Sequence, residues 1–209
     1  MKRLLPLACL LSLAACHVSP GPAGPVINAD KSHDWRTVAT DDDRARLREW
    51  RKTLIAALDS ARKAGHGAEI DREGVLLQPD LTLGGAALPN GDYRCRVIKI
   101  GAKSEGMLDY VTYPAFTCRV QPERGLQGFA KLTGSQRPIG LIFPADAGRQ
   151  VFLGTLELGD ESRAMQYGRD QDRDLAAWIQ RVDERRWRML FPSPHFESQA
   201  DVIELVPAP

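Results

Sequence analysis

The chain has 209 residues, of which 43% are hydrophobic and 26% are charged, proportions typical of a soluble globular protein. Its 28 Lys and Arg residues are balanced by 27 Asp and Glu residues. This balance excludes the strongly basic character of nucleic-acid-binding proteins, so we expect no nucleic-acid partner.

The amino-terminal segment predicts export. An apolar run over residues 4–13 follows Lys2 and Arg3 and leads into Leu-Ala-Ala-Cys, which ends at Cys16. A basic start, an apolar stretch and small residues before a cleavage point make a secretory signal. The four-residue sequence resembles a bacterial lipobox, whose cysteine is acylated after cleavage. The apolar run is too short for a membrane-spanning helix, which needs about 20 residues. We therefore expect residues 1–15 to be a signal peptide and Cys16 to carry lipid; the alternative is ordinary secretion with Cys16 as a spare thiol.

The residues after Cys16 predict where the protein is held. His17 takes the second position of the mature chain, where aspartate is associated with inner-membrane retention in enteric bacteria. We therefore expect a lipoprotein on the periplasmic side of the bacterial cell envelope, anchored in the outer membrane. Residues 16–33 are rich in Pro and Gly and predict a tether. The remaining residues, 34–209, are predicted to form one globular domain and a monomer.

A long amphipathic helix is predicted over residues 41–64. Thr40 and Asp43 have the spacing of a capping box, and Gly65 is expected to end the helix. Apolar residues recur every three or four positions: Leu47, Trp50, Leu54, Leu58 and Ala61. We expect this apolar stripe to pack on the rest of the domain.

After the helix, short β-like segments alternate with Gly- and Pro-containing turns. Strands are predicted near residues 74–78, 91–100, 108–120, 127–133, 138–143, 150–158, 162–167, 185–191 and 201–206. A short helix is predicted at 171–182. The pattern favours a mainly β (α+β) fold, in which a small antiparallel barrel or sandwich carries the long N-terminal helix and one short helix inserted before the last strands. Trp187 alternates with Met189 and Phe191, so we expect it in the core, with Arg185, Arg186 and Arg188 facing water.

Two cysteines remain for the mature domain once Cys9 and Cys16 are accounted for. Cys95 and Cys118 lie in extended segments, and an oxidising compartment favours a disulfide between them. A redox or metal-binding pair is the alternative, but no CxxC spacing occurs. The four histidines are scattered over the chain: His17, His33, His66 and His195. We therefore expect no metal and no cofactor.

Polar residues of three loop segments form a candidate binding cluster. The cluster consists of Ser135, Arg137, Asp160, Glu161, Tyr167, Arg169 and Glu197. Such groups can transfer protons or bind a divalent ion, but alternating charges favour mutually neutralising ion pairs. Ser135 lacks the Gly-x-Ser-x-Gly pattern of a serine hydrolase, and a hairpin turn explains its segment. The sequence assigns no catalytic residue.

Several short pieces of the chain together resemble one family. They lie at residues 91–99, 113–119, 134–138, 152–154, 159–161, 167–170 and 186–188. In this order they are similar to domain of unknown function 4893, an uncharacterised bacterial envelope family, over about residues 35–207. The resemblance implies a secreted or lipoprotein setting and brings no activity and no site residue.

Three functions remain open. The first is a non-enzymatic envelope lipoprotein, a binding or structural module for an envelope protein or another envelope component. The second is a lipocalin-like or protease-inhibitor-like barrel, which in the lipocalin-like form predicts an apolar cavity of about 300–1,000 Å³ for a small apolar ligand. The third is a hydrolase using Ser135, His195 and either Asp160 or Glu197, which requires these groups to be within hydrogen-bonding reach. The sequence favours a protein that is not an enzyme.

Overall fold

The computed structural model describes residue 27 and residues 33–85 and 87–209. The predicted signal peptide, Cys16 and most of the predicted tether lie outside the described residues. No helix in the described part of the chain is both long and apolar enough to cross a membrane.

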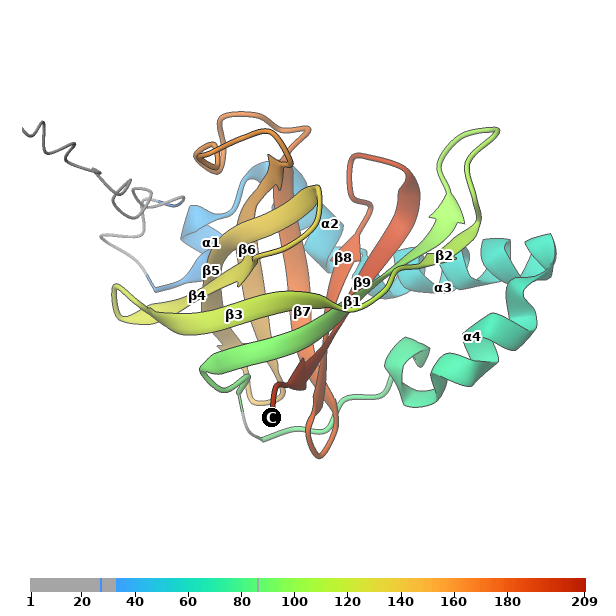
Figure 1. Ribbon diagram of the computed structural model, residues 1–209, viewed down its shortest axis with the longest axis horizontal. Coiled ribbons are helices and arrows are strands. Elements are labelled where there is room, and N and C mark those ends of the chain that lie inside the picture. The colour runs from blue at the N-terminus through green and yellow to red at the C-terminus, as the bar shows by residue number, and fades with distance from the viewer. Residues whose placement is uncertain (1–26, 28–32, 86) are drawn as a thin grey trace, which may run out of the picture.

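Eight antiparallel strands close into a barrel. The strands of the described residues are β1 (Gly91–Ala102), β2 (Tyr110–Thr112), β3 (Phe116–Glu123), β4 (Leu126–Lys131), β5 (Gln136–Asp146), β6 (Arg149–Leu158), β7 (Asp174–Asp183), β8 (Arg186–Pro192) and β9 (Ser198–Pro207). From β3 to β9 each strand pairs with the next, and β1 pairs with both β3 and β9. The remaining strand, β2, lies outside this closed order and pairs with the end of β1. The prediction of a mainly β fold is confirmed, as a barrel rather than a sandwich (Figure 1).

Alternation along the strands separates the barrel interior from an outer face covered by helices. On β1, Tyr93, Cys95 and Val97 face an interior cluster, whereas Ile98 and Ile100 pack under the helices. Phe129, Phe152 and Phe191 meet edge to face inside the barrel. Tyr93, Trp187 and Leu205 fill the end of the barrel where β1 begins and β9 ends.

The helical region lies on the outside of the barrel (Figure 1). It consists of α1 (Trp35–Val38), α2 (Asp41–Arg48), α3 (Trp50–Ala61), the π-helical turn η1 (Arg62–His66), α4 (Gly67–Glu73) and the 3₁₀ turn η2 (Gly74–Leu77). The predicted cap is confirmed, because the Thr40 side chain accepts a hydrogen bond from the Asp43 backbone N–H at 3.2 Å. The predicted apolar stripe does pack on the domain: Leu54 and Leu58 lie in one cluster with Ile98 and Ile100.

The predicted helix differs from the structure at two places. It is interrupted at Glu49, which ends α2 with φ −87° and ψ 4° before α3 begins. Gly65, with φ 101°, bends the chain but does not end the helical region, which resumes as α4. The predicted strand at 74–78 is wrong because the helical region continues this far: these residues form the 3₁₀ turn η2 and the residue after it.

Three further predictions need correction. The predicted helix at 171–182 is strand β7, with both faces buried. The predicted strand at 162–167 is part of the long loop between β6 and β7. The predicted strand at 108–120 divides into β2 and β3 around Pro114, which has no N–H for a ladder hydrogen bond.

The side chains around Trp187 follow the prediction only in part. Trp187 is buried in the barrel interior, as expected. Arg188 does not face water: it is fully buried on the outer face of β8, under the segment that follows η2.

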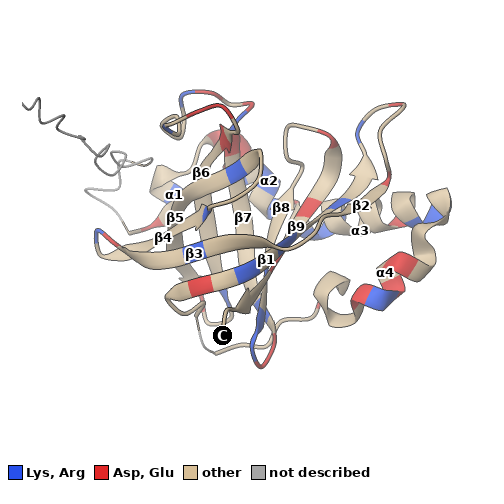
Figure 2. Cartoon of the chain, viewed as in Figure 1, with Lys and Arg blue, Asp and Glu red and all other residues tan. Residues whose placement is uncertain are grey.

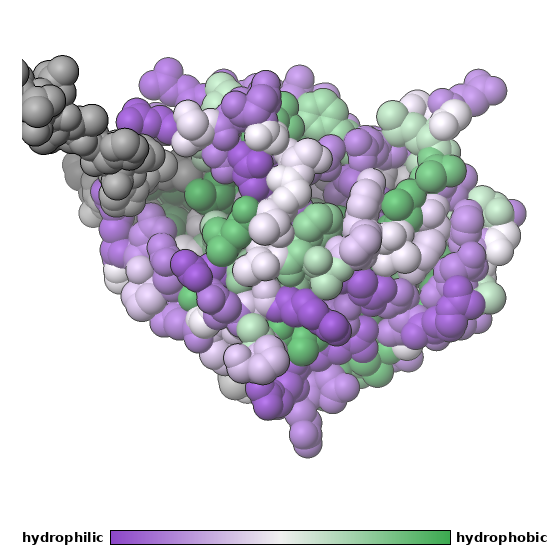
Figure 3. All heavy atoms as spheres, in the orientation of Figure 1, coloured by the Kyte–Doolittle hydropathy of each residue, from purple (hydrophilic) through white to green (hydrophobic). Residues whose placement is uncertain are grey.

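Charged residues of both signs are interspersed over the loops, the helices and the strand surfaces (Figure 2). On the face shown in Figure 3, hydrophobic residues form small patches separated by hydrophilic residues. The predicted disulfide is present: Cys95 and Cys118 are joined, with their Cα atoms 5.9 Å apart.

Candidate functional site

A cavity of 360 Å³ lies at the end of the barrel opposite the tightly packed interior. The loops that connect β4 to β5, β6 to β7 and β8 to β9 surround its opening, at the top of Figure 1. β3 begins only at Phe116, beside Cys95, so the upper half of β1 pairs with β2 instead. The barrel wall formed by β3 therefore ends level with Cys95, and the interior is open beyond this point.

Apolar side chains from six strands make the deep part of the cavity. They are Val97, Phe116, Leu156, Leu175, Phe191 and Ile203. All of them belong to or pack against the interior cluster. Tyr93 and Phe152 of the same cluster fill the closed end of the barrel and do not line the cavity.

Lys99 and two carboxylates form an ion-pair network on the cavity wall. The Lys99 Nζ atom lies 3.0 Å from an Asp201 carboxylate oxygen and 3.2 Å from a Glu197 oxygen. Burial alone would lower the pKa of Lys99, but these two carboxylates raise it above its ordinary value. Burial raises the pKa of Asp201, even with Lys99 and Ser198 beside it. These ion pairs link the neighbouring strands β1 and β9 with the β8–β9 loop, and they place two carboxylates against one lysine.

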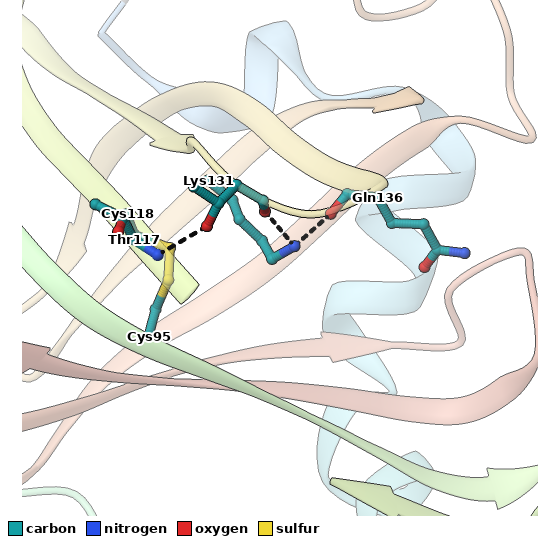
Figure 4. Close-up of a disulfide and its surroundings, with 6 residues drawn as sticks. Cys95, Thr117, Cys118, Lys131 and Gln136 are labelled. Carbon is teal, nitrogen blue, oxygen red and sulfur yellow. Dashed lines mark hydrogen bonds between the residues drawn. A yellow bond between two sulfur atoms is a disulfide. The ribbon is translucent and has the colours of Figure 1, made fainter. Parts of the chain in front are cut away.

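Lys131, at the end of β4, is a second lysine on the cavity wall. Its Nζ atom donates hydrogen bonds to the carbonyl oxygens of Thr133 and Gln136, each at 2.8 Å (Figure 4). The same atom lies 3.7 Å from the centre of the Phe116 ring. Burial, together with the charges of Arg137 and Lys99, lowers the pKa of Lys131 to about 8. No carboxylate of a described residue forms an ion pair with this lysine.

The rim of the cavity carries a histidine–carboxylate pair. His195 Nδ1 lies 3.2 Å from an Asp172 oxygen, and Ser135 lines the same opening. No hydrogen bond joins Ser135 to His195, and neither Asp160 nor Glu197 is the carboxylate that contacts the histidine. The geometry therefore lacks the nucleophile–base contact that a serine hydrolase needs.

Two residues of the predicted binding cluster, Ser135 and Glu197, line the cavity. Arg137 points away from it, toward Glu157 and the carbonyl oxygens of Leu158 and Glu161.

The other members of the cluster lie in the β6–β7 loop. Glu161 pairs with Arg173, and Tyr167 donates a hydrogen bond to buried Asp43 of α2. Asp160 and Arg169 are exposed in this loop. The ion-pair interpretation of this segment fits these contacts.

The family model described as Domain of unknown function (DUF4893) matches residues 35–205, which include the helices, the whole barrel up to Leu205 and every residue of the cavity. The chain belongs to the DUF4893 family. No curated protein and no solved structure matches it.

Sequence reasoning missed three charged residues of the DUF4893 cavity, Lys99, Lys131 and Asp201. The sequence did contain a signal for Lys99. Side chains alternate along a strand, so the inward positions Tyr93, Cys95 and Val97 of β1 predict that Lys99 also faces inward. The register adds Asp201, which lies directly opposite Lys99 on β9. No group of three or more His, Cys, Asp or Glu side chains within residues 33–85 and 87–209 could hold a metal ion.

Proposed function

We propose that this DUF4893 protein binds a small molecule in the open end of its barrel. The observation that carries the proposal is the 360 Å³ cavity with its apolar depth. Its volume falls within the range of about 300–1,000 Å³ found for small-molecule sites. This feature favours the small-ligand barrel over a module that recognises an envelope protein by its outer surface, because helices already cover much of that surface.

The cavity combines a closed bottom with polar groups at its mouth. Phe191 and Ile203 separate it from the packed interior, while Lys99, Lys131 and Glu197 lie nearer the loops. An apolar ligand body buried against the strands gains about 25 cal/mol per Å² of apolar surface removed from water. Polar groups at the mouth can then fix the orientation of a ligand. The arrangement supports binding, and the missing contact between Ser135 and His195 gives no support to hydrolysis.

A cell-envelope lipoprotein is the setting that we propose for this binding. The disulfide between Cys95 and Cys118 supports export, because such bonds persist in oxidising compartments. The Leu-Ala-Ala-Cys sequence before residue 17 supports an anchor at Cys16, on the periplasmic side of the outer membrane. A diacylglycerol on Cys16 would supply the two chains needed for stable attachment.

A fluorescence titration with N-phenyl-1-naphthylamine tests the binding proposal. This neutral, apolar dye fluoresces strongly only when it leaves water. We expect saturable, stoichiometric binding to the purified protein, and loss of that binding in Val97→Trp, because an indole at residue 97 fills the cavity.

The matched control is Val206→Trp. Like Val97, Val206 is a half-buried valine on a barrel strand, β9, but it does not line the cavity. We expect it to bind the dye as the wild-type protein does. No saturable binding to the wild-type protein, or equal binding to Val97→Trp and the wild type, would refute a ligand site in the barrel.

Metabolic labelling with a fatty acid tests the anchor separately. We expect the wild-type protein to incorporate label in its host and Cys16→Ala to lose it completely. Label that persists in Cys16→Ala would rule out acylation at this residue.

A further inference from the structure

Lys131 is a buried cation without a counter-charge. Only 5% of its surface is exposed, and no carboxylate of a described residue lies within 4.0 Å of its Nζ atom. Buried charges in proteins are normally paired, because an ion removed from water loses several kcal/mol of hydration. Lys99, on the same cavity, follows this rule, since Asp201 and Glu197 both contact it.

One hydrogen-bond donor of Lys131 lacks an oxygen acceptor in the part of the chain that the structure describes. An ammonium group has three N–H donors. The carbonyls of Thr133 and Gln136 accept two of them (Figure 4). The other contact is the face of the Phe116 ring. An aromatic ring is a weaker partner for an ammonium than an oxygen anion, which forms a charge-assisted hydrogen bond.

The β4–β5 hairpin is shaped around this ammonium. Gly134 has φ 89°, and a Cβ atom at this position would lie 2.7 Å from the Lys131 Nζ atom and 2.8 Å from the Phe116 ring. Only glycine therefore allows the hairpin to approach so closely. The two backbone carbonyls hold the ammonium in place beside the cavity instead of leaving it to reach into solvent.

We infer that the ligand is an amphipathic anion whose carboxylate, sulfonate or similar group accepts a hydrogen bond from Lys131, with its apolar part between Val97, Leu156 and Leu175. This inference rests on the proposed function and adds the chemical class of the ligand. A cationic ligand fits less well, because the carboxylates that would receive it, Asp201 and Glu197, already bind Lys99.

Two dyes that differ by one anionic group test the inference. They are N-phenyl-1-naphthylamine and 8-anilinonaphthalene-1-sulfonate, which share their ring system and differ by the sulfonate. In Lys131→Met we expect the affinity for the sulfonate to fall about tenfold or more, while the affinity for the neutral dye changes by less than about twofold, since only the charge-assisted contact is lost.

Lys103→Met is the matched control. Lys103 lies at the same end of the barrel and also donates to two backbone carbonyls, of Pro194 and His195, but it does not line the cavity. It removes the same charge, and we expect both affinities to stay within about twofold of wild type because exposed charges act weakly at a distance in salt. If Lys131→Met does not fold, Lys131→Gln, which keeps a donor for one of the carbonyls, should show the same loss for the sulfonate.

The outcomes separate the two proposals. If the neutral dye does not bind the wild-type protein, the proposed function fails. If it binds, but the folded Lys131 variant retains wild-type affinity for the sulfonate, or Lys103→Met loses as much affinity, the inference of an anionic ligand is overturned alone.

Discussion

Asp174 is a buried carboxylate of which one oxygen accepts a hydrogen bond and the other does not, among the described residues. It is 2% exposed at the start of β7. One of its oxygens accepts a hydrogen bond from the Gly168 N–H at 2.8 Å, and the other has no partner among the described residues. Burial, with the nearby charge of Asp43, raises the pKa of Asp174 to about 6. Its ionisation therefore opposes folding.

The pH dependence of stability should show this effect. Between about pH 4 and pH 6 the folded state keeps the Asp174 proton and the unfolded state has lost it, so stability falls as pH rises through this window. Asp174→Asn cannot ionise. We expect its free energy of unfolding, relative to wild type, to increase by about 2–3 kcal/mol between pH 4 and pH 7. Urea denaturation at both pH values measures the change, with Asp160→Asn, an exposed carboxylate of the same loop, as control. A constant difference would contradict the assignment.

Arg188 ties the segment after the helices to the barrel. Its guanidinium donates to Gln180 and to four backbone carbonyls, those of Leu76, Gln78, Pro79 and Leu81. Burial lowers its pKa to about 10. It is the hydrogen bonds, rather than an ion pair, that hold this cation in place.

Replacing this arginine should destabilise the protein strongly. Arg188→Met leaves buried carbonyls without donors, so we expect the free energy of unfolding to fall by about 3 kcal/mol or more. The neighbouring ion-pair variant Arg186→Met, whose side chain is 25% exposed beside Glu204, should lose only about 1 kcal/mol. Chemical denaturation of the two variants makes the comparison, and equal losses would show that the buried network carries no special weight.

Among the elements, the strands with one buried face were predictable and β7 was not. On β1 the alternation of Tyr93, Cys95 and Val97 with outward residues is clear in the sequence. On β7 the inward Leu175, Ala177 and Ile179 alternate with outward Ala176 and Trp178, which α1 and α2 cover. Because both faces are buried, the period of two disappears, and the alanines favour a helix.

The site was less predictable than the fold because it depends on pairing between distant segments. Ser135 and Glu197 could be selected as polar loop residues, and both line the cavity. The partners of Lys99 come from β9 and the β8–β9 loop, about one hundred residues away in the chain. Their proximity follows from the closure of the barrel by β1 and β9, which local sequence patterns do not contain.

The disulfide secures the point where β1 leaves β3. Cys95 is the last β1 residue paired with β3, and the bond to Cys118 links the two strands there. The bond closes a loop with a sequence separation of 23. In the chain-entropy treatment such a loop contributes about 3 kcal/mol, so we expect reduction to lower the free energy of unfolding by about this amount.

Urea denaturation with and without dithiothreitol measures this contribution. The double variant Cys95→Ala/Cys118→Ala is the control and should unfold at the same urea concentration in both conditions, close to the reduced wild type. A wild-type protein insensitive to reductant, with thiols shown by alkylation to be free, would contradict a stabilising role.

At the scale of the whole molecule, the barrel has two different ends. The end near the C-terminus is packed by aromatic rings, and the other end keeps a cavity between loops. The helices stiffen the outside of the same strands: the Trp178 indole N–H donates to the Leu47 carbonyl at 2.9 Å, and Leu54 and Leu58 cover β1 and β9. A rigid wall of this kind suits a preformed cavity.

Methyl NMR spectra recorded during addition of N-phenyl-1-naphthylamine show directly whether a ligand binds inside the barrel. We expect the methyl signals of Val97, Leu156 and Ile203 to shift and to saturate together, while those of Leu47, on α2, and Leu153, in the same cluster outside the barrel, stay unchanged. Shifts confined to the outer face, or no saturable shift of the cavity methyls, would contradict the account.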